Sequence, residues 1–231
     1  MSQLFLPFQS NSTADIFAKE DFLIVAENLS AFNALTKFCS QSDFANSKFP
    51  ALILKGPKSC GKTHLLHFLG HKVGAEFLNK DNISTVNPVN FFEKNSFYIL
   101  EDVENIKDEE LILRLFNSAL EAEAFLIISS SKTLKFTIKD LESRLQNLFL
   151  VEIENPDLDT ITQLLMNLFS RKQINLSRPV IDFVSNNIER SYEAILLAVK
   201  LIEFHTQEDG KALKMPKIRE IFSLIDKNND K

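Results

Sequence analysis

The sequence predicts an α/β protein in which a parallel sheet covered by helices is followed by a small all-α domain. Before Pro156, short and almost continuously apolar runs alternate with segments of helical periodicity. This alternation is typical of a parallel sheet that is buried on both faces. After Pro156 only helical periodicity remains, and the length of 231 residues fits one full domain plus a smaller one at roughly 150 residues per domain.

The individual strands and helices follow from the positions of the apolar runs and of the prolines and glycines between them. The expected strands are residues 51–55, 76–78, 97–100, 125–128 and 148–153. The helices expected in the same domain are residues 29–39, 62–72, 108–121 and 139–146. In the second domain we expect helices at residues 158–172, 179–188, 191–205 and 216–225.

The domain boundaries follow from changes in composition along the chain. Polar residues are frequent near both ends, and such ends usually fray. We therefore expect a flexible N-terminal tail at residues 1–20, the α/β domain at residues 21–155 and the helical domain at residues 156–231.

The composition excludes several classes of protein. With 26 basic and 31 acidic residues the net charge is −5, which argues against a general nucleic-acid coat, because such proteins need clustered Lys and Arg. The two cysteines, Cys39 and Cys60, exclude a disulfide framework and favour a cytosolic protein. No apolar run approaches the roughly 20 residues that span a bilayer, so no membrane partner is expected.

One loop carries the pattern G-x-x-x-x-G-K-[ST] of phosphate-binding loops. It lies between an expected strand and an expected helix, so its N–H groups and the positive end of the helix face the same place. The chain has only five glycines, which argues against an accidental pair here. We expect ADP or ATP, with Lys62 at the β- and γ-phosphates and Thr63 as a ligand of Mg²⁺. The loop consists of Gly56, Pro57, Lys58, Ser59, Cys60, Gly61, Lys62 and Thr63.

Two acidic residues, Glu101 and Asp102, follow the expected strand 97–100. If this strand is the parallel neighbour of strand 51–55, both carboxylates lie beside Thr63. We then expect Glu101 to be a second magnesium ligand and Asp102 to orient the attacking water. An aspartate usually holds the metal, so a glutamate in this position puts efficient hydrolysis in doubt. Alternatively, both acids are solvated loop residues.

From Gly61 onward the sequence reads GKTHLLH, and this run resembles the bacterial replication initiator DnaA and its relatives in the AAA+ class of P-loop NTPases. The similarity extends loosely from about Asp21 to Ile225. It implies an AAA+ core followed by a helical lid, and it includes His64 among the nucleotide-binding residues. The alternative, a zinc site on the histidines of this helix, lacks a Cys or carboxylate to complete it.

Further segments resemble other functional parts of that family. Residues 125–132 are similar to the strand that carries sensor 1, and residues 141–145 are similar to the box VII helix. The resemblance makes Arg144 an arginine finger that acts in trans on the ATP site of a neighbouring protein; the alternative is a surface arginine on a short helix. At the sensor 2 position the chain has Glu193, with Arg190 one turn earlier. This departure fits a nucleotide binder better than a fast ATPase.

The first residues resemble the short motif by which proteins dock on the bacterial sliding clamp. Such a motif offers one polar anchor and several apolar side chains to a hydrophobic groove. The alternative is a strand that folds back on the chain's own core. The matching residues are Gln3, Leu4, Leu6, Pro7 and Phe8.

Together these resemblances imply a DnaA-related regulator of replication initiation. It would dock on the sliding clamp, meet the ATP-bound initiator DnaA and promote hydrolysis of the initiator's ATP. The sequence stops directly after the expected lid, so we expect contact with DNA only through these partners, in the bacterial cytoplasm, and self-association stays open. Two alternatives remain: an ATP-hydrolysing protein of the helicase-loader type and a non-catalytic adaptor tethered to the clamp.

Overall fold

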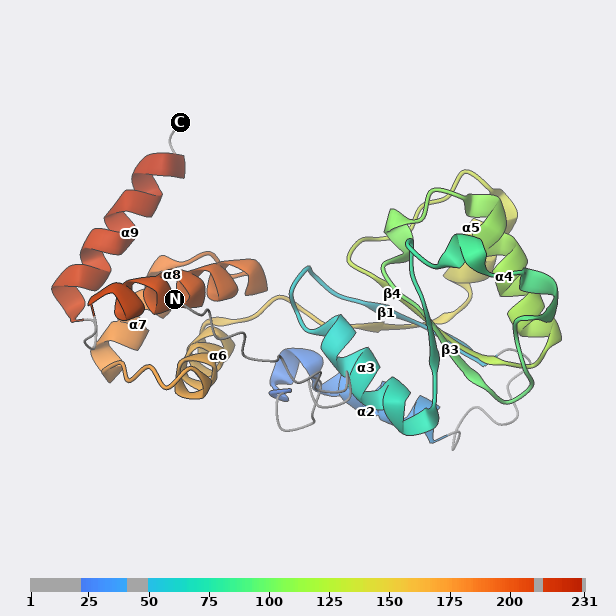
Figure 1. Cartoon of the computed structure of the whole chain (residues 1–231), viewed down its shortest axis with the longest axis horizontal. Coiled ribbons are helices and arrows are strands. Elements are labelled where there is room, and N and C mark those ends of the chain that lie inside the picture. The colour runs from blue at the N-terminus through green and yellow to red at the C-terminus, as the bar shows by residue number, and fades with distance from the viewer. Residues whose placement is uncertain (1–21, 41–49, 210–213, 230–231) are drawn as a thin grey trace, which may run out of the picture. The chain divides into compact units, whose positions relative to one another are not determined.

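The computed structural model describes residues 22–40, 50–209 and 214–229, and Figure 1 shows the chain as a ribbon. The expected clamp-docking residues, Gln3 to Phe8, lie outside the described residues. The chain divides into two compact units. Of the described residues, the first unit holds 22–24, Ala31–Lys55 and Gly61–Val151, and the second holds Val25–Ser30, Gly56–Cys60 and the residues from Glu152 onward.

A five-stranded sheet with the strand order β2-β3-β4-β1-β5 forms the centre of the α/β part. The pairs β1–β4, β3–β4 and β2–β3 are parallel, which confirms the predicted fold class. All five strands lie close to their expected positions. They are β1 (Ala51–Lys55), β2 (Glu76–Leu78), β3 (Phe97–Leu100), β4 (Phe125–Ser130) and β5 (Phe149–Glu152).

The strand between β1 and β3 is β4, so the expectation that strands 51–55 and 97–100 are neighbours is wrong. Every residue of β4 is buried, as suits a strand in the middle of a sheet covered on both faces. Apolar runs report burial but not strand order, because the order depends on the paths of the connecting helices.

Helices cover both faces of the sheet (Figure 1). On one face, the Phe38 ring meets the rings of Phe97 and Phe125 edge-on, at centroid distances of 6.1 and 5.7 Å. On the opposite face, Ile53 and Ile128 belong to one buried cluster together with side chains of two helices. The helices of this unit are α2 (Ala26–Cys39), α3 (Lys62–Val73), α4 (Glu109–Glu121) and α5 (Lys139–Gln146).

Most helix ends lie close to the expected positions, but α2 begins three residues earlier, and α8 and α9 end four residues later, than expected. The α4 helix begins after Asp108 because this side chain is its N-cap, with Oδ1 accepting the N–H of Leu111 at 2.9 Å. The sequence patterns did not predict the short 3₁₀ helices. These are η2 (Ile83–Thr85), η3 (Pro88–Asn90) and η4 (Val103–Asn105).

The second unit is helical, as predicted for the part after Pro156. Ile161, Leu165, Val184 and Ile202 are completely or almost completely buried, so the apolar stripes of three helices form its core. Within the described part of the chain, no helix is both long enough and apolar enough to cross a membrane. The helices are α6 (Leu158–Arg171), α7 (Arg178–Asn187), α8 (Tyr192–Asp209) and α9 (Met215–Asn229).

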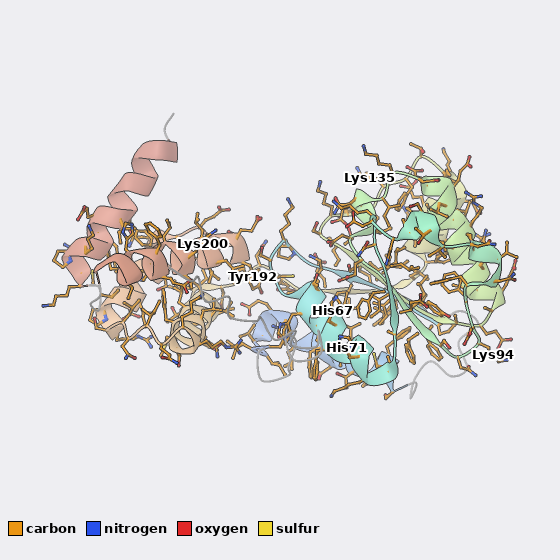
Figure 2. All side chains as sticks on the ribbon, in the orientation of Figure 1. His67, His71, Lys94, Lys135, Tyr192 and Lys200 are labelled. Carbon is orange, nitrogen blue, oxygen red and sulfur yellow. The ribbon has the colours of Figure 1, made fainter. Side chains whose placement is uncertain are left out.

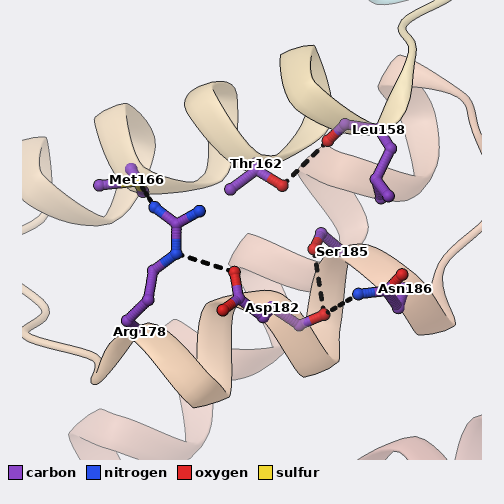
Figure 3. Close-up of polar contacts among 7 residues, drawn as sticks. All are labelled: Leu158, Thr162, Met166, Arg178, Asp182, Ser185 and Asn186. Atoms are coloured by element: carbon purple, nitrogen blue, oxygen red, sulfur yellow. Dashed lines mark hydrogen bonds and ion pairs between the residues drawn. The ribbon is translucent and has the colours of Figure 1, made fainter.

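Polar contacts add to the packing of α6 against α7 (Figure 3). The Arg178 guanidinium donates to Asp182 Oδ1 at 2.8 Å and to the sulfur of Met166 at 3.4 Å. One side chain at the first turn of α7 therefore contacts both its own helix and α6.

Candidate nucleotide-binding site

The loop between β1 and α3 has the backbone geometry that its two glycines permit. Gly61 has a φ of 94°, a left-handed conformation that is strained for other residues. Its carbonyl accepts the N–H of Leu65 at 2.9 Å, so Gly61 starts the helix without a side-chain cap. At Gly56 a Cβ atom would lie 2.8 Å from Cys60 Sγ and 3.0 Å from Ile153 Cβ, so only glycine fits without displacement.

The residues after the loop lie where the pattern requires. Lys62 is the first residue of α3 and is only 7% exposed, which is unusual for a lysine. The next residue, Thr63, is exposed, and its side chain is close enough to the carboxylate of Glu101 to lower the pKa of that group. The structure therefore brings together the two residues that the sequence assigns to magnesium.

The contact between Thr63 and Glu101 does not need neighbouring strands. Helix α3 packs over β3, and Glu101 is the first residue after β3. The helix that follows the loop, and not the adjacent strand, therefore brings the hydroxyl to the carboxylate. The expected proximity is right for Glu101 although the expected strand order is wrong.

Glu101 is a buried carboxylate that is 8% exposed. Burial raises its pKa, the side chain of Thr63 opposes this, and the nearby charge of Asp102 adds to the increase. Its Oε1 atom has no hydrogen-bond partner within the described residues. A buried, unsatisfied carboxylate oxygen is costly, and a divalent cation held with the Thr63 hydroxyl would satisfy it. The donor set is one that Mg²⁺ accepts.

A histidine lies on the other side of this carboxylate. His67 Nε2 is 3.6 Å from Glu101 Oε2, and the His67 ring stacks on Phe77 at 4.1 Å. Burial, followed by the charges of His71 and His64, lowers the pKa of His67. Figure 2 shows His67 and His71 on α3.

His64, the third histidine of this helix, packs its ring at 5.7 Å from Phe22. Among the described residues, no group of three or more His, Cys, Asp or Glu side chains is arranged as a metal site.

Asp102 differs from Glu101 in position and in backbone conformation. It has a φ of 47° and precedes η4, and its N–H donates to Ser129 Oγ at 3.0 Å. Ser129 belongs to β4 and is 1% exposed, in the segment that resembles sensor 1. The two acids are therefore separated: Glu101 points to Thr63, while Asp102 is held by β4 through its backbone.

Sequence patterns missed a third acidic residue in the same region. Glu104 Oε1 accepts the N–H of Ser131 at 2.8 Å and also the Ser131 hydroxyl. Burial alone would raise the pKa of Glu104, but these hydrogen bonds lower it below its usual value. No local sequence pattern marks Glu104, because its partner Ser131 lies 27 positions away in the sequence.

The predicted finger residue, Arg144, lies in α5. Leu141 and Leu145 of this helix are buried, so they fix the helix while the guanidinium stays 36% exposed. Arg144 Nε donates to Asp140 Oδ1 at 3.0 Å, one turn earlier. Arg144 is therefore paired within its own helix and remains partly exposed.

In the second unit, Tyr192 and Glu27 hold the segment that follows β5. Tyr192 is 6% exposed and donates from its hydroxyl to the carbonyl of Glu154 at 3.1 Å. Burial, then the nearness of Cys60 and Glu27, raises the pKa of Tyr192. Glu27 accepts the N–H of Asp157 at 3.0 Å and the hydroxyl of Thr160 at 2.7 Å. Sequence patterns did not single out Glu27 or Tyr192.

Comparisons with known proteins give the relatives of the whole chain. No protein-family model matches the chain. The chromosomal replication initiator DnaA of Helicobacter hepaticus is 26% identical over 94% of this chain and 52% of that protein. DnaA of Thermomicrobium roseum is 25% identical over 78% of this chain and 45% of its own length. The chain thus spans about half the length of these relatives.

Solved structures give the fold. Domain III of Thermotoga maritima DnaA superposes with a TM-score of 0.70 at 17% identity, covering 89% of this chain and 95% of that domain. DnaA bound to AMPPCP and single-stranded DNA gives 0.66 at 18% identity, over 84% and 68% of the two chains. The RuvB branch migration motor of Thermotoga maritima gives 0.66 at 10% identity, over 90% and 72%.

The parallel sheet and the helical second unit give the chain the fold of AAA+ proteins. Its sequence is related to that of DnaA over most of its length.

Proposed function

We propose that the loop from Gly56 to Thr63 binds ADP or ATP. The left-handed Gly61, the start of α3 at Lys62 and the pairing of Thr63 with Glu101 support this. The related DnaA structures were solved with an ATP analogue. Lys62 would contact the β- and γ-phosphates, and Thr63 with Glu101 would hold Mg²⁺, whose charge offsets that of the phosphates. We assign His64 to the surroundings of the nucleotide.

We further propose that the chain regulates replication initiation, in the manner of Hda, the clamp-bound protein that inactivates DnaA. The supporting observation is Arg144, whose guanidinium stays partly exposed on a helix with two buried leucines. A guanidinium placed against a partner's γ-phosphate stabilises charge that develops in the transition state. The proposed partners are the initiator DnaA with its bound ATP and the sliding clamp. The clamp would be bound through Gln3, Leu4, Leu6, Pro7 and Phe8.

On this proposal the chain's own nucleotide has a mainly structural role. Asp102 would orient water for any intrinsic hydrolysis, but its N–H is tied to Ser129 and the metal position is occupied by a glutamate with a raised pKa. Both features fit slow turnover better than fast turnover.

The test is the hydrolysis of ATP bound to purified DnaA, with clamp loaded on DNA and this chain added. The wild type should stimulate hydrolysis, and Arg144→Ala should lose about 10³-fold or more of the stimulated rate. Arg114→Ala removes an exposed arginine of α4 and serves as the matched control. Equal stimulation by Arg144→Ala and the wild type would show that Arg144 is not the finger.

A second candidate is an ATPase that works by its own turnover, as the shared fold with the RuvB motor allows. Measuring ATP hydrolysis by this chain alone separates the two functions. Fast turnover that is lost in Glu101→Gln and Asp102→Asn would favour the motor or helicase-loader type. If neither the wild type nor Lys62→Ala binds ADP detectably, a non-catalytic adaptor is favoured instead.

A further inference from the structure

The helix that carries Arg144 lacks an N-cap side chain of its own. Its N-cap residue is Ile138, which makes no side-chain capping bond. The first N–H groups of a helix need acceptors, and loss of a capping acceptor destabilises the helix. An acceptor from another element therefore stabilises the start of α5.

The acceptor is the carboxylate of Glu109, from the first turn of α4. Glu109 Oε2 accepts the N–H of Ile138 at 2.9 Å, the N–H of Thr137 at 2.9 Å and the Thr137 hydroxyl at 2.7 Å. The Thr137 hydroxyl, then the two N–H groups, lower the pKa of Glu109, so this residue is ionised at neutral pH. A negative charge at this place also favours the N-terminus of α5.

Glu109 makes the last of three contacts between the segment after β3 and the segment that begins at the end of β4. Asp102 pairs with Ser129, and Glu104 pairs with Ser131. The residues of the first two pairs are 27 positions apart in the sequence, and Glu109 and Thr137 are 28 positions apart. The two segments therefore run side by side, from the proposed metal site to the start of α5.

Leu141 and Leu145 anchor one side of α5 in the core, and an open pocket borders the helix on another side. A pocket of about 220 Å³ lies between the loop after β4 and α5. Leu134 and Phe136 line it from the loop, and Glu142 and Leu145 line it from α5. The hydrogen bonds of Glu109 therefore add a polar contact at the start of α5 to the apolar contacts of its two buried leucines.

We propose that Glu109 is a positioning residue for Arg144: it fixes the start of α5 and thereby the direction in which the guanidinium is presented. This inference rests on the proposed function of Arg144 as a finger. Because a small misplacement of a catalytic group can cost a large factor in rate, loss of this contact should lower the stimulated rate without weakening complex formation.

The test compares Glu109→Ala with Glu110→Ala. Glu110 is exposed and lies in the same first turn of α4, so both variants lose the same favourable charge at the α4 N-terminus. Amide hydrogen exchange of residues 138–146 should be about fivefold faster in Glu109→Ala and unchanged in Glu110→Ala. Equal exchange in the two variants would overturn the proposal.

The second readout is the hydrolysis of DnaA-bound ATP. In Glu109→Ala the maximal stimulated rate should fall about tenfold or more, while the concentration for half-maximal stimulation stays the same. Glu109→Gln keeps one acceptor oxygen and should restore part of the rate. Faster exchange with an unchanged maximal rate would overturn the positioning role. A wild type that gives no stimulation would overturn the proposed function instead, and exchange would still decide whether Glu109 holds α5.

Discussion

The side chain of Thr63 lies beside the buried carboxylate of Glu101 and lowers its pKa, although the strands that precede these two residues are not neighbours. The contact exists because α3 crosses toward β3 after leaving the loop. A phosphate-binding loop and an acidic residue are thus joined by helix packing, which places the proposed metal site under the first turn of α3.

Removing the Thr63 hydroxyl should weaken nucleotide binding only when Mg²⁺ is present. Thr63→Val keeps the shape of the side chain but removes the ligand, and changes near a metal typically cost about 10–100-fold in affinity. Titration calorimetry with ADP, with and without Mg²⁺, measures the effect. Thr63→Ser retains the hydroxyl and should bind like the wild type. A loss of the same size without Mg²⁺ would mean that Thr63 does not act through the metal.

Adding a methyl group at Gly56 should destabilise the fold because its Cβ would lie 2.8 Å from Cys60 Sγ and 3.0 Å from Ile153 Cβ. Overpacking of this kind typically costs about 1–3 kcal/mol. Cys60→Ala removes the nearer atom, so the double variant should be less destabilised than the sum of the single variants. Urea unfolding of the wild type, Gly56→Ala, Cys60→Ala and the double variant gives the coupling free energy between the two positions. Strict additivity would show that the loop moves away from Cys60 at little cost.

Ser131→Ala should lower stability in a pH-dependent way. The hydrogen bonds from Ser131 lower the pKa of Glu104 in the folded state. This stabilisation is therefore present above the ordinary carboxyl pKa and is lost as the pH falls through the lowered value. Glu104 is partly exposed, so we expect about 1 kcal/mol at pH 7.

The measurement is the difference in unfolding free energy between wild type and Ser131→Ala from pH 7 down to acid pH. The difference should shrink as Glu104 becomes protonated. Ser143→Ala, at an exposed position of α5, should show no such trend. A difference that is constant with pH would assign the loss to packing and not to the carboxylate.

The sequence alone predicted the sheet class, the strand positions and the phosphate-binding loop. These depend on local signals: β1 and β3 are uninterrupted apolar runs, and Gly61 stands at the start of a helix. It did not predict the central position of β4, since burial is equal for a strand in any interior position. Glu104 and Glu109 also gave no signal, because their partners lie 27 to 29 residues away.

Tyr192 illustrates the same limit in the second unit. The resemblance drew attention to this segment because the family has its sensor 2 arginine there. At that position this chain has Glu193, and the nearest arginine, Arg190, lies one turn earlier. Arg190 precedes α8, and Glu193 is exposed. The buried residue between them is Tyr192, whose hydroxyl contacts Glu154, 38 positions earlier. A contact of that separation follows from the tertiary fold and has no local pattern.

Deleting residues 3–8 should abolish binding to the sliding clamp and leave the melting temperature unchanged. The expectation rests on a polar anchor, Gln3, and on the apolar side chains of Leu4, Leu6 and Phe8, which suit an extended segment in a hydrophobic groove. Surface plasmon resonance with purified clamp measures binding, and calorimetry measures stability.

The matched control for this deletion removes residues 9–14, a polar stretch of the same length, and should keep clamp affinity. The double variant Gln3→Ala, Leu6→Ala separates the side chains from the length of the tail and should behave like the deletion. Clamp binding that survives the deletion would remove the docking role. A large fall in melting temperature would instead favour a strand folded onto the core, because only residues that pack in the folded state can stabilise it.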